Sequence, residues 1–201
     1  MLKKQLPDGT YVEKVNHLEQ TAEANLTDMV AGFFDPAGLS ESEIVQICTE
    51  CLNVANYTIA FDRIARVIAV CLHDTTWARE VYKRGEAVIN EIDDYTGLAD
   101  SVIKYLHDRE WGLKLIEQAK IIVDKDPKAF GYLNIADAYC DYVRDKIKGK
   151  ENYLLAEKYA YEYDEYDCIA ASVLNNLNDC VWFSELVDKA HLLAKGTQEI
   201  Y

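Results

Sequence analysis

The chain has 201 residues, half of them hydrophobic, so it is long enough to bury a sizeable core and too apolar to be disordered. Only 3 Pro and 9 Gly argue against a turn-rich β architecture. The 35 Asp and Glu outnumber the 21 Lys and Arg, and the resulting net charge of −14 argues against any nucleic-acid partner held by a general basic surface.

The start of the chain carries no apolar stretch after Lys3 and Lys4, which indicates that no secretory signal is present. The sequence also lacks a run of 18 apolar residues, which a membrane-spanning helix would need. Six cysteines without an export signal are expected to stay as thiols, although disulfide pairing is left open. We therefore expect a cytoplasmic protein without a membrane partner.

We expect residues 1–37 to form an N-terminal segment with a capping helix, and residues 38–201 to form one continuous helical-repeat domain. Residues 6–10, Leu-Pro-Asp-Gly-Thr, are a turn signal, so we expect no sheet beyond a short N-terminal hairpin. Residues 15–34 are expected to be helical and to cover the first repeat unit. The Ser-x-x-Glu pattern of Ser40 and Glu43 predicts a capping box at the next helix start.

An aspartate then recurs at the presumed start of later helices. Leu-x-Asp occurs at residues 72–74, 106–108 and 177–179, and Val-Arg-Asp at 143–145 is a degenerate copy. Three of these aspartates have a tryptophan three positions later. Aspartate is a preferred N-terminal cap, so each copy predicts a helix start. The aspartates are 34, 37 and 34 residues apart, at Asp74, Asp108, Asp145 and Asp179.

Small residues recur at two further positions of each copy, where two antiparallel helices could cross closely. The copy that begins at Asp108 is three residues longer than the others, and we expect the extra residues in a loop at 126–128, Asp-Pro-Lys. The small residues are Cys51, Gly85, Ala119, Ala156 and Ala190 at the first position, and Ala65, Ala99, Ala136 and Ala170 at the second.

A helix–turn–helix unit of 34 residues resembles the tetratricopeptide class of α-solenoids. The resemblance covers residues 38–196 and concerns period and architecture rather than consensus, so no peptide-binding residues are transferred. It implies an all-α fold, namely a right-handed α-solenoid of about four and a half helix–turn–helix repeats with an N-terminal helical cap.

The cysteines and histidines do not have the pattern of a metal or redox site. Cys48 and Cys51 have the spacing of a zinc knuckle or a redox dithiol, but their repeat register matches core positions, so we interpret them as buried, metal-free and unlinked. His73 and His107 are repeat-equivalent turn residues and too far apart for one metal ion.

We expect no catalytic residues, no metal and no cofactor, because no catalytic or phosphate-binding motif is present. A helical enzyme with no linear motif stays an alternative.

Acidic residues gather in two stretches. From Val15 to Asp62 there are eight carboxylates and no Lys or Arg. The second stretch, residues 157–167, interleaves acids with tyrosines, which together can form a recognition surface for a basic protein. The alternative is a solvated helix face, with Tyr159, Tyr163 and Tyr166 on one helical stripe. The candidate partner-binding residues are Tyr161, Glu162, Tyr163, Asp164, Glu165, Tyr166 and Asp167.

These patterns predict a non-catalytic protein–protein interaction module that binds a basic protein partner. One specific form would be an immunity protein that neutralises a cationic toxin. A general helical-repeat scaffold or adaptor is the alternative from the same class. The oligomeric state is left open.

Overall fold

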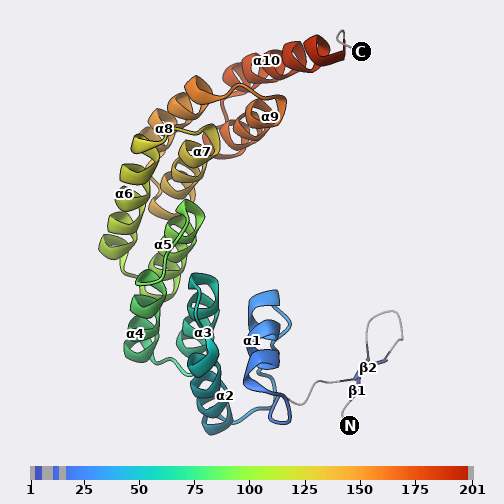
Figure 1. Ribbon diagram of the computed structural model, residues 1–201, viewed down its shortest axis with the longest axis vertical. Helices are drawn as coiled ribbons and strands as arrows, with labels where there is room; N and C mark the ends of the chain where they lie inside the picture. The colour runs from blue at the N-terminus through green and yellow to red at the C-terminus, as the bar shows by residue number, and fades with distance from the viewer. Residues whose placement is uncertain (1–2, 6–10, 14–16, 199–201) are drawn as a thin grey trace. The chain divides into compact units, whose positions relative to one another are not determined.

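The computed structural model describes residues 3–5, 11–13 and 17–198, and the described chain is all-α apart from one short hairpin (Figure 1). The expectation of an all-α protein is confirmed. The chain divides into two compact units, residues 1–85 and 86–201, and each is described by itself. Among the described residues, no helix combines the length and the apolar character needed to cross a membrane.

The described residues of the first unit form a hairpin and four helices. Strand β1 (Lys3–Gln5) pairs antiparallel with β2 (Tyr11–Glu13), as expected, while the turn signal at 6–10 lies outside the described residues. Helices α1, α2 and α3 pack against one another. The helices are α1 (Ala22–Ala31), α2 (Glu41–Val54), α3 (Thr58–Cys71) and α4 (Thr75–Glu86).

Helix α1 is shorter than the helix expected over residues 15–34, of which 15 and 16 lie outside the described residues. Thr21 caps its start by accepting a hydrogen bond from the Ala24 amide at 3.3 Å, and Gly32 ends it in the left-handed conformation with φ 79°. Before the helix, the buried His17 accepts a hydrogen bond from the Asp35 amide at 3.3 Å through Nε2. Local caps therefore set both ends of α1, which the hydrophobic pattern alone did not reveal.

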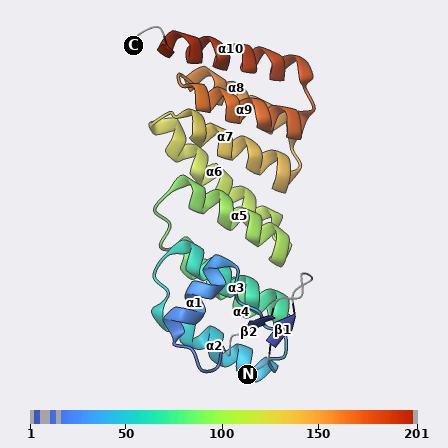
Figure 2. The ribbon, with the colours of Figure 1, turned by 90° about the vertical axis from the view of Figure 1, so that its right-hand side faces the viewer.

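The second unit consists of paired helices, which Figure 2 shows as successive layers from α5 to α10. Helix α5 packs against α6, α7 against α8, and α9 against α10. Helices α7 and α9 each end in a π-helical turn, η1 and η2. The bounds are α5 (Ile92–Leu106), α6 (Arg109–Lys125), α7 (Ala129–Ala138), η1 (Tyr139–Val143), α8 (Lys146–Tyr159), α9 (Tyr163–Ser172), η2 (Val173–Leu177) and α10 (Cys180–Gln198).

The recurring Leu-x-Asp sequence is a very short helix-to-helix turn. The middle residue has a left-handed backbone conformation that ends one helix, and the aspartate caps the next. At the α5–α6 turn, His107 has φ 55° and Asp108 Oδ1 accepts from the Trp111 amide at 3.0 Å. The other left-handed residues are His73, Arg144 and Asn178, followed by the caps Asp74, Asp145 and Asp179. The predicted helix starts, including the capping box at Ser40, are confirmed.

The small positions of the repeat are buried as expected. Two helical glycines lie at equally close crossings: a Cβ on Gly112 would collide with the Ile103 side chain, and one on Gly149 with Cys140 Sγ. The predicted crossing residues Cys51, Ala65, Gly85, Ala99, Ala119, Ala136, Ala156, Ala170 and Ala190 are all buried.

The three extra residues of the copy that begins at Asp108 are not in the loop at 126–128, where we expected them. The loops after α6 and α8 have equal length, residues 126–128 and 160–162, whereas α6 has 17 residues and α8 has 14. The insertion therefore lengthens helix α6, because residues such as Ile121, Ile122 and Val123 are compatible with a continued helix.

Candidate protein-interaction groove

The acidic tyrosine segment, residues 161–167, spans the α8–α9 loop and the first turn of α9. The alternative, in which Tyr159, Tyr163 and Tyr166 share one stripe on a single helix, is wrong in this respect, because α8 ends at Tyr159 and Ala160 has an extended backbone with ψ 134°. The carboxylate of Glu165 holds the new helix start by accepting hydrogen bonds from the amides of Tyr161 at 2.8 Å and Glu162 at 3.0 Å.

The seven predicted residues divide into two groups by their contacts. Glu165 is buried and Tyr166 is half-buried, with its hydroxyl donating to the Ala160 carbonyl at 3.0 Å. Both side chains hydrogen-bond to the backbone of the loop and stabilise it. The exposed group is Tyr161, with 72% of its surface accessible, together with Glu162, Tyr163, Asp164 and Asp167.

Part of this segment lines a groove of about 610 Å³ in the second unit. The start of α5, the loop between α6 and α7 with the start of α7, and the α8–α9 loop form its walls. The lining residues are Asn90, Glu91, Ile92, Asp93, Ile122, Pro127, Lys128, Phe130, Gly131, Asn134, Tyr159, Tyr161, Glu162 and Glu165.

The groove has an apolar, aromatic wall. Phe130 and Ile122 remain 45% and 40% exposed, although both are large hydrophobic side chains. Tyr159 stacks on the ring of buried Tyr132 with ring centroids 5.5 Å apart. The Tyr132 hydroxyl donates to Asp124 Oδ1 at 2.8 Å, which fixes this stack in place. An exposed apolar surface next to a fixed ring suits the burial of a partner's side chain.

The rim of the groove is negatively charged. Among the lining residues, four carboxylates face one amine, that of Lys128. This amine lies 2.8 Å from Asp126 Oδ2, and the hydrogen bond raises the pKa of Lys128. Glu91, Asp93 and Glu162 are the exposed carboxylates among the lining residues. The groove therefore combines apolar contact area with a preference for basic groups.

The base-free stretch between Val15 and Asp62 lies in the first unit. One of its carboxylates has a structural role: Glu43 Oε2 accepts from the Ser40 amide at 2.7 Å, and its hydrogen bonds to Ser40 lower the pKa of Glu43. Among the pockets found on the described residues, neither the 610 Å³ groove nor the smaller one between α8 and α10 includes this stretch.

The sequence patterns missed a polar cluster that joins α7, α8 and α9. The Asp137 carboxylate accepts from the Tyr153 hydroxyl at 2.5 Å, the Asn176 amide at 3.1 Å and the Ser172 hydroxyl at 3.3 Å. Burial raises the pKa of Asp137 and that of Tyr153. Asn176 also donates to Tyr153 at 2.7 Å, so the members satisfy one another and lock three helices together. The sequence did contain one signal for this cluster: in two copies of the repeat, an aspartate directly follows the small crossing residue, namely Asp100 after Ala99 and Asp137 after Ala136.

The cysteine and histidine predictions concern packing and turns. Cys48 and Cys51 are fully buried, as expected, and both are free thiols. Burial raises the pKa of Cys48 to about 12 and that of Cys51 to about 11, which disfavours the reactive thiolate. His73 and His107 are exposed turn residues. Among the described residues, no three His, Cys, Asp or Glu side chains are grouped so that they could hold a metal ion.

Comparison of this chain with protein-family models, with curated proteins and with solved structures gave no significant match.

Proposed function

We propose that this chain is a non-catalytic protein-interaction module whose groove captures a basic protein. The observation that carries the proposal is the side chain of Tyr161, which is 72% exposed and lines the same groove as an apolar wall and the carboxylates Glu91 and Glu162. An exposed tyrosine supplies a large, rigid contact area at low entropic cost. Carboxylates around it select a cationic partner and accelerate the encounter.

The helices that carry the groove are proposed to be units of a tetratricopeptide-like, right-handed α-solenoid, with about four and a half units along the chain. The recurring turn supports this proposal, since a residue in the left-handed conformation followed by an aspartate cap precedes each of α4, α6, α8 and α10. The buried small residues at equivalent positions support it as well. Stacked units of this kind characteristically present extended binding surfaces.

An immunity protein that neutralises a cationic toxin is the specific form of this function that the net charge of −14 favours. Its groove would bind the positively charged surface with which such a toxin approaches its own substrate. A general adaptor would use the same groove with several partners. Purification and identification of the partner distinguish these two forms.

The experiment is affinity capture from the source cells with three versions of the full chain. The wild type is compared with a groove variant, Tyr161→Ala combined with Glu91→Lys, and with a control, Asp188→Lys, in which an exposed carboxylate of α10 away from the groove is reversed. We expect a protein rich in Lys and Arg to be retained by the wild type and the control and lost by the groove variant. Equal retention by all three would show that the groove is not the binding surface.

A further inference from the structure

The start of helix α8 is the most basic part of this acidic chain. Residues 144–150, Arg-Asp-Lys-Ile-Lys-Gly-Lys, carry four bases and one acid, in a protein with a net charge of −14. Three of the lysines lie in the first turns of α8, where the helix macrodipole disfavours positive charge. Ion pairs with neighbouring helices account for two of these lysines, since Lys148 Nζ lies 3.0 Å from Glu117 Oε1 and Lys150 pairs with Asp179. Helix stability does not account for the exposed Lys146 at the start of the helix.

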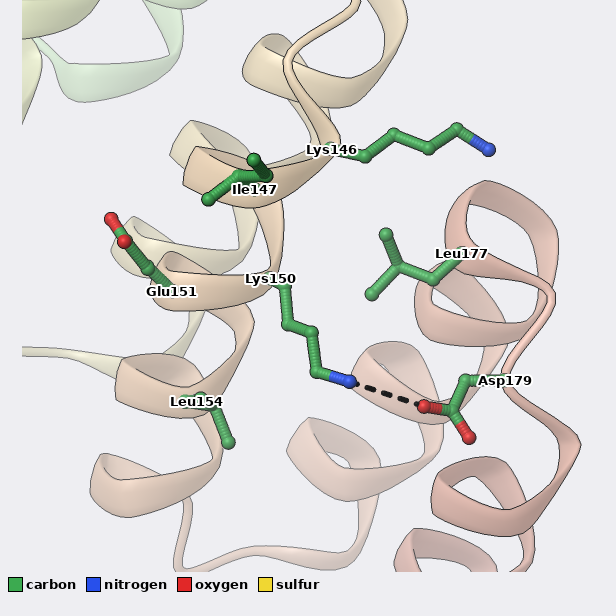
Figure 3. Close-up of a pocket in the computed structure, with 7 residues that line it drawn as sticks. All are labelled: Lys146, Ile147, Lys150, Glu151, Leu154, Leu177 and Asp179. Carbon is green, nitrogen blue, oxygen red and sulfur yellow. Dashed lines mark hydrogen bonds and ion pairs between the residues drawn. The ribbon is translucent and has the colours of Figure 1, made fainter.

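Beside these lysines lies a second groove, of about 460 Å³, between α8 and the turn from η2 into α10 (Figure 3). Its apolar lining is Ile147, Leu154 and Leu177, of which Ile147 is 76% and Leu154 50% exposed. Exposed aliphatic side chains that line a concavity commonly mark a site of contact with another molecule.

Figure 3 shows how the charged side chains are arranged at this groove. Lys150 reaches across it to Asp179, with Nζ 3.3 Å from Oδ2, and Lys146 extends along the opposite end toward the side of Leu177. Glu151 points away from Leu177 and Asp179. The amine of Lys146 thus remains exposed beside an apolar surface, which suits a segment that combines an apolar group with a carboxylate.

The chain itself contains such a segment. Residues 161–167 hold four acids and no base, and Tyr161 is the most exposed of their tyrosines. This segment follows the C-terminal end of α8, whereas the lysines are at its N-terminal end. A helix of 14 residues is about 21 Å long, and Glu165 fixes the loop at the far end of α8, so one copy cannot bring its own loop carboxylates to its own Lys146. Contact between the two requires a second copy.

We propose that the groove between α8 and α10 binds the Tyr161 loop of a second copy of this chain. The Tyr161 ring packs on Ile147, Leu154 and Leu177, and the loop carboxylates Glu162 and Asp164 face Lys146 and Lys150. The contact is head to tail, so each copy keeps one unused loop and one unused groove for further copies. A basic protein bound at the acidic groove would occupy the same loop, so partner capture and self-association would compete.

Sedimentation velocity of the full chain tests this proposal, at physiological salt, where charge repulsion between the acidic molecules is screened beyond about 8 Å. We expect the sedimentation coefficient to rise with protein concentration from the micromolar to the millimolar range. Ile147→Asp and Tyr161→Ala should each weaken association about tenfold or more, since each removes a central apolar contact. The matched control is Leu192→Asp, which alters a 70% exposed leucine outside the groove and should leave association unchanged.

A charge exchange tests the pairing directly. Lys146→Glu in one preparation and Asp164→Lys in another should each self-associate less than the wild type, and their mixture should recover association. A wild-type chain that stays monomeric at all concentrations would overturn the proposal, as would association that Ile147→Asp and Leu192→Asp affect equally. A monomer that still captured a basic protein would leave the proposed function standing.

Discussion

The indole nitrogen of Trp182 donates a hydrogen bond to Glu157 Oε2 at 2.9 Å, and the same bond joins Trp111 to Glu86 at 3.0 Å. In both pairs the partners are 25 residues apart. In these two copies, the tryptophan that follows the aspartate cap therefore ties its helix to a carboxylate that comes just after a small crossing residue. This equivalence gives the repeated tryptophan a physical role that its position in the sequence did not reveal.

Replacing Trp182 by Phe should destabilise the protein. The change keeps an aromatic ring but removes the indole donor from Glu157, and a hydrogen bond to a charged group is worth about 1.5–3 kcal/mol. Urea denaturation followed by circular dichroism should report a loss in this range. An unchanged free energy of unfolding would show that the bond to Lys189 alone satisfies Glu157.

The left-handed residue of the helix-to-helix turn should respond to substitution in both directions. His107 has φ 55°, a conformation that costs non-glycine residues about 1–2 kcal/mol. His107→Gly should raise the free energy of unfolding by about 0.5–1 kcal/mol, and His107→Val should lower it by at least as much. Thermal and urea melts of the two variants check this order. Equal stability of both would mean that the strain is relieved elsewhere in the turn.

Asn152 should be replaceable with a gain in stability. It is only 3% exposed, and its Oδ1 accepts no hydrogen bond among the described residues. The equivalent positions in α6 and α10 are the buried Leu115 and Leu186. Asn152→Leu should stabilise the protein by about 1–2 kcal/mol, because it removes a buried unsatisfied group. A loss of stability would indicate that the Asn152 amide, which donates to the Lys148 carbonyl at 2.8 Å, matters more.

Thiol labelling should separate the six cysteines into groups. Cys168 and Cys180 are exposed and should react in the native protein, while Cys48 and Cys51 should react only after unfolding. Because burial raises the pKa of Cys48 from 9.0 to about 12, the unfolded state loses this proton first. The stability that Cys48 contributes is therefore fully present below pH 9 and falls as the pH rises toward 12. Rapid native labelling of Cys48 would contradict its buried placement.

Local chemistry made the helix starts predictable from the sequence. Ser40, Asp74 and Asp108 each need only a backbone amide three residues away, so their caps can be inferred from a few neighbouring residues. The break between α8 and α9 could not be inferred in this way, since no Gly or Pro marks it. It depends on Glu165, which reaches back to two amides before its own helix.

The groove was only partly predictable. Composition drew attention to Tyr161 and Glu162, which do line it. Glu91, Ile122 and Phe130 come from distant parts of the chain, and only the packing of α5, α6 and α7 brings them together. Exposure also could not be inferred, because the equally acidic Glu165 is buried in a cap while Asp164 is exposed.

The association rate of the purified basic partner tests the central claim most directly. Glu91→Lys combined with Asp164→Lys reverses two exposed charges and leaves the capping box of Glu162 and Glu165 intact, and Glu185→Lys combined with Asp188→Lys makes the same change of net charge on α10. Stopped-flow or surface-based kinetics should show association slowed about tenfold or more by the first pair, with dissociation and melting temperature nearly unchanged. The α10 pair should slow association much less. Equal rates for the two double variants would contradict the claim that this groove captures the partner.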